Sequence, residues 1–196
     1  MTYKGDLLGG ALLIRENKKL APFILNKSDE NKLKHAIEIE NILEKRSVSS
    51  AKRNATAIKK RLRSLPVQVL ELLVDADYEL ASQICLVSVL KQNRLLGDFM
   101  YIILKEHYQL GREDIEKHTF MSFVNEQSRE HPDDINFNET SLKKISQVVF
   151  LILAESGYIA DTKSRKLQNV IIRPELKSLL EKENEQYVLS CMGVSR

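Results

Sequence analysis

The sequence is 196 residues long, with 43% hydrophobic and 29% charged residues, proportions close to those of globular domains. This length fits one ordinary domain or two small domains packed together, and it is long enough to bury a hydrophobic core. With 7 glycines and 4 prolines the composition excludes a linker-rich or fibrous chain, while a net charge of +3 says little until it is mapped along the sequence.

The cysteines and the apolar runs indicate the cell compartment in which the protein works. Cys85 and Cys191 are far apart and form no metal-ligand spacing, so we expect two reduced thiols and neither a disulfide framework nor a zinc site. The longest apolar run, residues 148–154, is far shorter than the roughly 18 to 20 residues that cross a bilayer. We therefore expect a cytoplasmic protein without a membrane span.

The first third of the chain has the apolar periodicity of amphipathic helices. Ser28 fits an N-cap position, with Asp29 and Glu30 in the following first turn. The serine-rich residues 47–50 break the periodic pattern, and Pro66 suits the first turn of a helix. These signals predict a first helical stretch from residue 7 that ends near residues 22–26, helices over residues 28–46 and 50–64, and a fourth that starts at Pro66.

The centre of the chain continues the helical series, with Gly111 and Gly157 at helix ends. We expect two central core helices, a more polar amphipathic stretch and a helix that is apolar on most sides, over residues 78–90, 95–108, 112–129 and 142–155. Tyr158 with Ile159, a polar turn over residues 161–166, and the apolar residues 170–172 predict a β-hairpin. A last helix is expected to begin at Pro174.

These elements predict a mainly α fold, a compact multi-helix bundle with a helix-turn-helix-like element and one C-terminal, wing-like β-hairpin. The stretch 131–138, with Pro132, Asp133 and Asp134, is the clearest loop. We therefore predict a helical N-terminal subdomain over residues 1–130 and a helix/β-hairpin/helix subdomain over residues 139–196, packed as one compact unit.

The basic residues are concentrated in one segment, residues 45–63, which holds eight of them and no acidic residue. The rest of the chain has 22 basic against 27 acidic residues. One strongly positive patch on a mildly acidic body indicates a localised anionic partner.

At 100° per residue, the third predicted helix has an apolar stripe and an opposite cationic face. Lysine and arginine neutralise phosphates and release counterions, while small polar residues such as Ser50 and Thr56 permit close approach. The candidate nucleic-acid-binding residues of this helix are Ser50, Lys52, Arg53, Thr56, Lys59, Lys60, Arg61 and Arg63.

The preceding helix, the serine-rich turn and this basic helix together resemble a helix-turn-helix. Lys163, Arg165 and Lys166, at the tip of the predicted hairpin, are candidate secondary contacts with the backbone of a nucleic acid. A solvated surface face and an ordinary polar turn are the structural alternatives, and for the hairpin that alternative is at least as well supported. For the basic helix, a merely solvated face is less well supported than nucleic-acid contact, since a solubilising face usually mixes charges of both signs.

Catalytic patterns are weak. His35, His107, His118 and His131 have no metal-ligand spacing, and the Gly5, Gly9, Gly10 cluster lacks the ending of a P-loop. The acidic pairs, Asp98 with Glu106 and Asp133 with Asp134, have no accompanying nucleophile or motif. We expect no enzymatic activity, no cofactor, no metal and no small-molecule substrate.

Several short motifs spread over most of the chain resemble the BrxA family of the BREX (bacteriophage exclusion) systems of bacteria. The motifs are Tyr3-Lys4-Gly5-Asp6 through Gly9-Gly10-Ala11-Leu12-Leu13 and Glu16, Ser50-Ala51-Lys52-Arg53 with Arg61-Leu62, Asp98-Phe99, Leu153-Ala154-Glu155-Ser156-Gly157-Tyr158-Ile159, and Pro174-Glu175-Leu176. The resemblance implies a compact helical protein whose core is similar to that of the NusB antitermination factor. It further implies that this helical protein binds double-stranded DNA, belongs to a phage-defence system and catalyses no reaction.

The residues and the resemblance together favour a DNA-binding accessory protein that contacts the duplex backbone, with other BREX proteins as further partners. Two alternatives remain open. One is an RNA-binding, NusB-like factor, and the other is a protein adaptor whose basic face docks on an acidic subunit of a defence complex.

Overall fold

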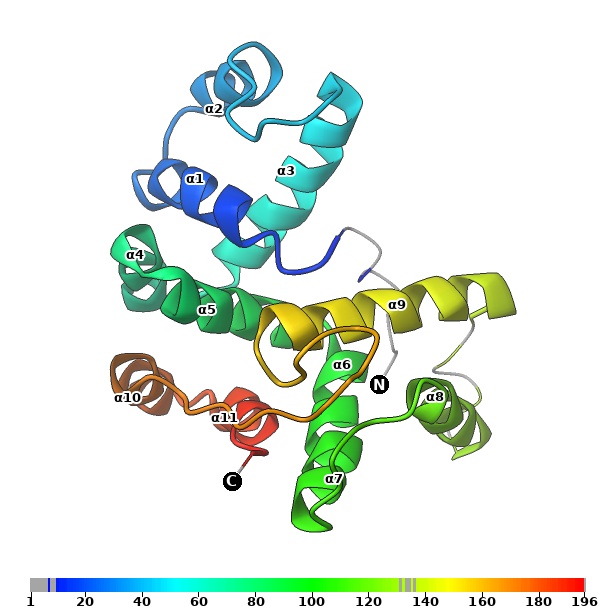
Figure 1. The fold of residues 1–196 in the computed structure, drawn as a ribbon. Helices are drawn as coiled ribbons and strands as arrows, with labels where there is room; N and C mark the ends of the chain where they lie inside the picture. The colour runs from blue at the N-terminus through cyan, green and yellow to red at the C-terminus, as the bar shows by residue number, and fades with distance from the viewer. Residues whose placement is uncertain (1–6, 8–9, 131, 133–134, 136, 196) are drawn as a thin grey trace. The chain divides into compact units, whose positions relative to one another are not determined.

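The computed structural model describes residues 7, 10–130, 132, 135 and 137–195, and this part of the chain is mainly helical, as predicted (Figure 1). The chain forms two compact units, which we call the N-terminal unit (residues 12–92) and the C-terminal unit (residues 1–11 and 93–196). The N-terminal unit has 15 basic and 10 acidic residues, whereas the C-terminal unit has 15 basic and 17 acidic ones. The excess positive charge therefore belongs to the N-terminal unit.

The N-terminal unit is a bundle of helices around α1. Its elements are α1 (Ile14–Leu25), α2 (Glu30–Glu38), α3 (Val48–Arg63), α4 (Val67–Asp75) and α5 (Tyr78–Leu90). Helix α1 packs against α3, α4 and α5, and α3 also packs against α2 and α5. Leu20 and Ala21 of α1 are fully buried, which anchors the bundle.

The C-terminal unit is built around one long helix. Its elements are α6 (Arg94–Asp98), η2 (Phe99–Leu104), α7 (Lys105–Gln109), α8 (Thr119–Glu130), α9 (Glu139–Glu155), α10 (Pro174–Lys182) and α11 (Gln186–Met192). The segments α6, η2 and α7 join through helical backbone conformations, so they form a single helix with a π-helical middle. Phe99 of this helix lies edge-on to Phe120 of α8, with 5.0 Å between the ring centroids.

Helix α11, which the sequence patterns did not predict, is fixed to the long helix through Tyr187. The Tyr187 hydroxyl donates a hydrogen bond to Asp98 Oδ1 over 2.9 Å, and the Arg94 guanidinium lies 3.9 Å from the centre of the Tyr187 ring. A Cβ atom at Gly97 would overlap that hydroxyl. Glycine at position 97 therefore permits the contact that holds α11.

The predicted wing-like β-hairpin over residues 158–172 is wrong, because the described residues contain no β-strand. The segment forms only two isolated bridges, Ile159 with Leu167 and Asp114 with Lys166. Beyond Gln168 the backbone leaves this pairing, since the Tyr108 hydroxyl binds the Gln168 carbonyl and the Ser195 hydroxyl both accepts from Val170 N (3.0 Å) and donates to Val170 O (2.7 Å). Side-chain hydroxyls thus take the backbone groups that a second strand would need.

The predicted second helix is too long. Helix α2 ends at Glu38, and residues 39–47 form an irregular connection, in which Asn41 and Glu44 have positive φ angles of 49° and 53°. Residues in this left-handed region cannot continue an α-helix. The connection of nine residues is also longer than the three or four of a helix-turn-helix turn. Leu43 is only 2% exposed although it lies in this connection. A buried apolar residue in a loop therefore fitted the periodic pattern of a helix.

The predicted boundary at residues 131–138 also differs from the structure, where the two units divide between residues 92 and 93. Helices α8 and α9 flank the 131–138 stretch and pack against each other, so both belong to the C-terminal unit. His131, Asp133 and Asp134 lie outside the described residues, as do residues 3–6 and Gly9 of the family motifs.

Within the described part of the chain, no helix combines the length and the apolar character required to cross a membrane.

Candidate nucleic-acid interface

Helix α3 forms as the sequence predicts, with small differences at its ends. Ser47 is the N-cap, and its Oγ accepts a hydrogen bond from the Ser50 backbone N–H over 3.2 Å. The apolar stripe is buried, with Ala51, Ala55, Ile58 and Leu62 all at most 3% exposed. Burial of the stripe fixes the rotation of the helix, and so it decides which basic residues face solvent.

The structure places most of the predicted contact residues on the outer side of α3. Ser50 and Lys59 are half-buried, and the exposed ones are Lys52, Arg53, Thr56, Lys60 and Arg63. Arg61 is the exception, because it is 5% exposed and lies with the buried residues of the helix. The helical projection predicted that Arg61 lies at one edge of the cationic face. In the structure Arg61 is not part of the outer face.

Two glutamates of α2 contact the cations along one edge of this face. Lys52 Nζ lies 2.9 Å from Glu38 Oε2, and Glu30 pairs with both Lys59 (3.2 Å) and Arg63 (2.6 Å). The hydrogen bond from Arg63 holds the pKa of Glu30 below its usual value, with Lys59 adding to the effect. Glu30 is 61% exposed, and ion pairs in such positions are weak and easily exchanged.

These acidic partners were not found from the sequence. A pairing between two helices that are separated by a connection of nine residues leaves no local pattern, so no spacing rule reveals it. A groove of about 320 Å³ lies between α2 and α3, and its walls include Lys34, Glu38, Lys52, Thr56 and Lys59. The groove places mixed charges beside the purely basic outer side of α3.

Arg53 is the cation of α3 that stands most clearly apart from this mixed edge. Its side chain is exposed, and the α2 glutamates pair with Lys52, Lys59 and Arg63 instead.

Arg46, in the connection before α3, is exposed as well, whereas the neighbouring Lys45 pairs with Glu16 of α1. Arg46 was counted in the basic segment but was not chosen as a contact residue, and its exposure makes it a further candidate.

The loop at residues 161–166 uses its cations differently. Arg165 is half-buried, with Nε donating to the Ile115 carbonyl over 2.9 Å and Nη1 donating to the Thr162 carbonyl over 3.1 Å. Lys163 and Lys166 are exposed. Because the loop belongs to the C-terminal unit and α3 to the N-terminal unit, each cationic cluster is described by itself.

The same loop is stiffened by Asp161, whose carboxylate accepts hydrogen bonds from the backbone N–H groups of Lys163 (2.7 Å) and Ser164 (2.8 Å). These bonds, led by that from Ser164, lower the pKa of Asp161. The loop is therefore an ordered turn that presents two lysines, and its arginine supports the turn.

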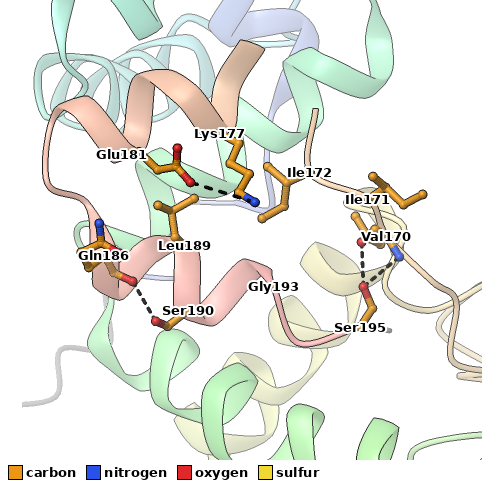
Figure 2. Close-up of a pocket in the computed structure, with 10 residues that line it drawn as sticks. All are labelled: Val170, Ile171, Ile172, Lys177, Glu181, Gln186, Leu189, Ser190, Gly193 and Ser195. Atoms are coloured by element: carbon orange, nitrogen blue, oxygen red, sulfur yellow. Dashed lines mark hydrogen bonds and ion pairs between the residues drawn. The ribbon is translucent and has the colours of Figure 1, made fainter. Parts of the chain in front are cut away.

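A separate cavity of about 510 Å³ lies beside α10 and α11 (Figure 2). The polar groups around it bind one another: Ser190 donates to the Gln186 carbonyl, Ser195 binds the backbone of Val170, and Lys177 lies 4.0 Å from Glu181. Such internal pairing leaves this cavity with little to offer a charged ligand.

The fold and the surface define the class of protein. It is a helical protein of two units, and its N-terminal unit presents a helix that is buried on one side and cationic on the other. The profile of the BrxA family matches residues 1–184. The chain therefore belongs to the BrxA family.

Similar proteins agree with this assignment. A "BREX protein BrxA" from Paramagnetospirillum magneticum (strain ATCC 700264 / AMB-1) is 31% identical, over 98% of this chain and 97% of the relative. A second, from Escherichia coli O9:H4 (strain HS), is 29% identical over 98% of this chain and 90% of its own length. The crystal structure of an uncharacterized protein from Magnetospirillum magneticum superposes with a TM-score of 0.90 at 30% identity, and the match covers 100% of both chains.

Proposed function

We propose that this protein is a non-enzymatic, cytoplasmic component of a BREX phage-defence system that holds double-stranded DNA by its phosphate backbone. The observation that carries the proposal is the outer face of α3, where Lys52, Arg53, Lys60 and Arg63 are exposed on a helix whose opposite side is buried. Membership of the BrxA family supplies the defence context.

Electrostatics supports backbone contact rather than base readout. Arginine and lysine on one helix face can each neutralise a phosphate, and the released counterions drive binding. Glu30 acts as a weak local partner that a phosphate can replace, since it is 61% exposed and exposed ion pairs contribute little. The N-terminal unit contains α3 and also carries the excess positive charge. This charge attracts a polyanion to the unit that presents the basic helix.

The test is a charge reversal on the outer face. The Lys52→Glu, Arg53→Glu, Lys60→Glu variant should bind a duplex roughly 100-fold more weakly, and its log-log salt dependence should be shallower by about three units, one for each lost phosphate contact. The matched control reverses three exposed lysines elsewhere, Lys32→Glu, Lys144→Glu and Lys182→Glu, with the same change in net charge.

Fluorescence anisotropy with a labelled duplex, at salt concentrations between 50 and 300 mM, measures both quantities. Circular dichroism verifies that both variants are folded. Equal loss in the two variants would show only a net-charge effect, and parental affinity in the α3 variant would overturn the proposal. Tighter binding to matched RNA than to DNA would shift the assignment to an RNA-binding factor. Partners that survive nuclease treatment of a pull-down, and that the α3 variant loses, would instead identify a protein adaptor.

A further inference from the structure

A second cavity in the C-terminal unit has the composition of a ligand site. Its volume is about 660 Å³, and it lies between the start of α8, the middle of α9 and the loop at residues 161–166. Cavities that bind small molecules measure roughly 300 to 1,000 Å³. All of its lining residues belong to one unit, so the cavity does not depend on the placement of the other.

The walls of this cavity, which we call the α8–α9 cavity, combine cations with an apolar surface. Phe150 and Leu151 of α9 and Met121 of α8 supply the apolar part. Leu151 is 42% exposed although most other apolar side chains of α9 are buried. An exposed leucine at a cavity wall gains when a ligand covers it.

The charged part of the lining is entirely positive. Lys117, Lys143 and Arg165 contribute the cations, His118 lies next to Lys117, and no carboxylate among the residues that the structure describes lines the cavity. Two of these residues have acidic partners outside the lining: Glu116 is 3.2 Å from His118, and Glu139 is 2.7 Å from Lys143. Both pairs are largely exposed, so an anion can compete for these cations at little cost.

Arg165 is already positioned for a ligand. Its bonds to the Ile115 and Thr162 carbonyls fix the side chain, and its guanidinium carbon lies 6.0 Å from the centre of the Phe150 ring. The guanidinium has further N–H groups beyond those two bonds. A fixed arginine loses little side-chain entropy on binding, which favours recognition of a phosphate.

We propose that the α8–α9 cavity binds a nucleoside phosphate. The phosphate lies against Lys117, Lys143 and Arg165, and the planar base covers Leu151 and the half-buried Met121. Gln147 and Thr162, which also line the cavity, provide polar groups for the edge of the base. The proposal stands apart from DNA binding by α3, because none of its residues lies in the N-terminal unit.

Isothermal titration calorimetry of the full chain with AMP, ADP, adenosine and inorganic phosphate tests the proposal. AMP and ADP should bind at micromolar to sub-millimolar concentrations, and adenosine and inorganic phosphate at least about tenfold more weakly, because each lacks half of the recognised groups. Equal binding of AMP and phosphate, equal binding of AMP and adenosine, or no heat below about 1 mM for any of the four would each overturn the proposal.

Two variants locate the site. Leu151→Glu places a negative charge at the cavity wall and should weaken AMP binding at least about tenfold. Leu110→Glu, at an exposed leucine outside the cavity, is the matched control and should bind AMP as the parent does. Unchanged AMP binding by folded Leu151→Glu would place the ligand elsewhere and overturn the assignment. The α3 charge-reversal variant should retain AMP binding, so the two proposals can fail separately.

Discussion

The outer face of α3 and the loop at residues 161–166 are both cationic, but they are built in opposite ways. In α3 the backbone groups bind one another, so Arg53 and Lys60 are not needed to satisfy backbone carbonyls. The loop has irregular backbone, and Arg165 donates to the carbonyl of Thr162 within it and to the carbonyl of Ile115, which precedes α8. A cation on a regular helix is not needed to satisfy the backbone, whereas a cation in an irregular turn is often part of the turn.

The largest expected difference between the two regions is in salt-dependent binding. Arg53→Gln with Lys60→Gln should make the log-log salt slope of duplex binding shallower by about two units, since two phosphate contacts are lost. Lys163→Gln with Lys166→Gln in the loop should change the slope by less than about one unit. Fluorescence anisotropy over a salt series compares the two pairs. A larger effect in the loop pair would reverse the comparison and make the loop the main contact.

The second difference is in stability. Arg165→Ala removes two hydrogen bonds to backbone carbonyls and should lower the free energy of unfolding by about 1 to 2 kcal/mol. Arg53→Ala, on the exposed face of α3, should stay within about 0.5 kcal/mol of the parent. Urea unfolding followed by circular dichroism measures both. If Arg165→Ala leaves stability unchanged, the arginine is not a structural part of the turn.

A third test concerns the support of α3 itself. Ser47→Ala removes the N-cap hydrogen bond to the Ser50 N–H and should destabilise the chain by about 1 kcal/mol. Ser49→Ala, two residues later and also exposed, is the matched control with a smaller expected cost. Because neither serine supplies a cation, the salt slope of binding should stay at the parental value. A shallower slope in Ser47→Ala would show that the cap contributes directly to the interface.

The smallest expected effect is at the acidic edge of α3. Glu30→Gln removes the carboxylate that pairs with Lys59 and Arg63, and duplex affinity should rise by about twofold, the size expected of one exposed charge. The lowered pKa of Glu30 keeps this group ionised at neutral pH, so substitution tests its charge and a moderate pH change does not. Glu71→Gln on α4 is a control with the same change in charge. Weaker binding of Glu30→Gln would mean that the glutamate positions the cations rather than competing for them.

Much of the helical framework could be predicted from local patterns. Tyr78–Leu90 forms the helix that its apolar residues indicate, and α3 differs from its prediction by only a residue or two at each end. Local signals such as the serine cap and the buried stripe are sufficient there, because a helix satisfies its backbone within a short segment.

The errors have a common cause, which is contact between residues far apart in the sequence. The predicted β-hairpin lost its second strand because Ser195 and Tyr108 bind the backbone near residues 168–170. The division between residues 92 and 93 leaves no compositional signal, and the 131–138 loop joins helices that pack together. Hydrogen bonds and packing of this kind are set by the folded chain, so no local pattern reports them.

The sequence by itself determined that one helix is basic on one side and apolar on the other, since helical geometry and residue order fix that arrangement. Only the tertiary structure decided which cations are exposed and which are paired. Arg61 is buried, Glu30 and Glu38 reach three of the others, and Arg165 donates to the carbonyls of Ile115 and Thr162. The physical reason is that exposure and charge pairing depend on neighbouring elements, and these are brought together only when the chain folds.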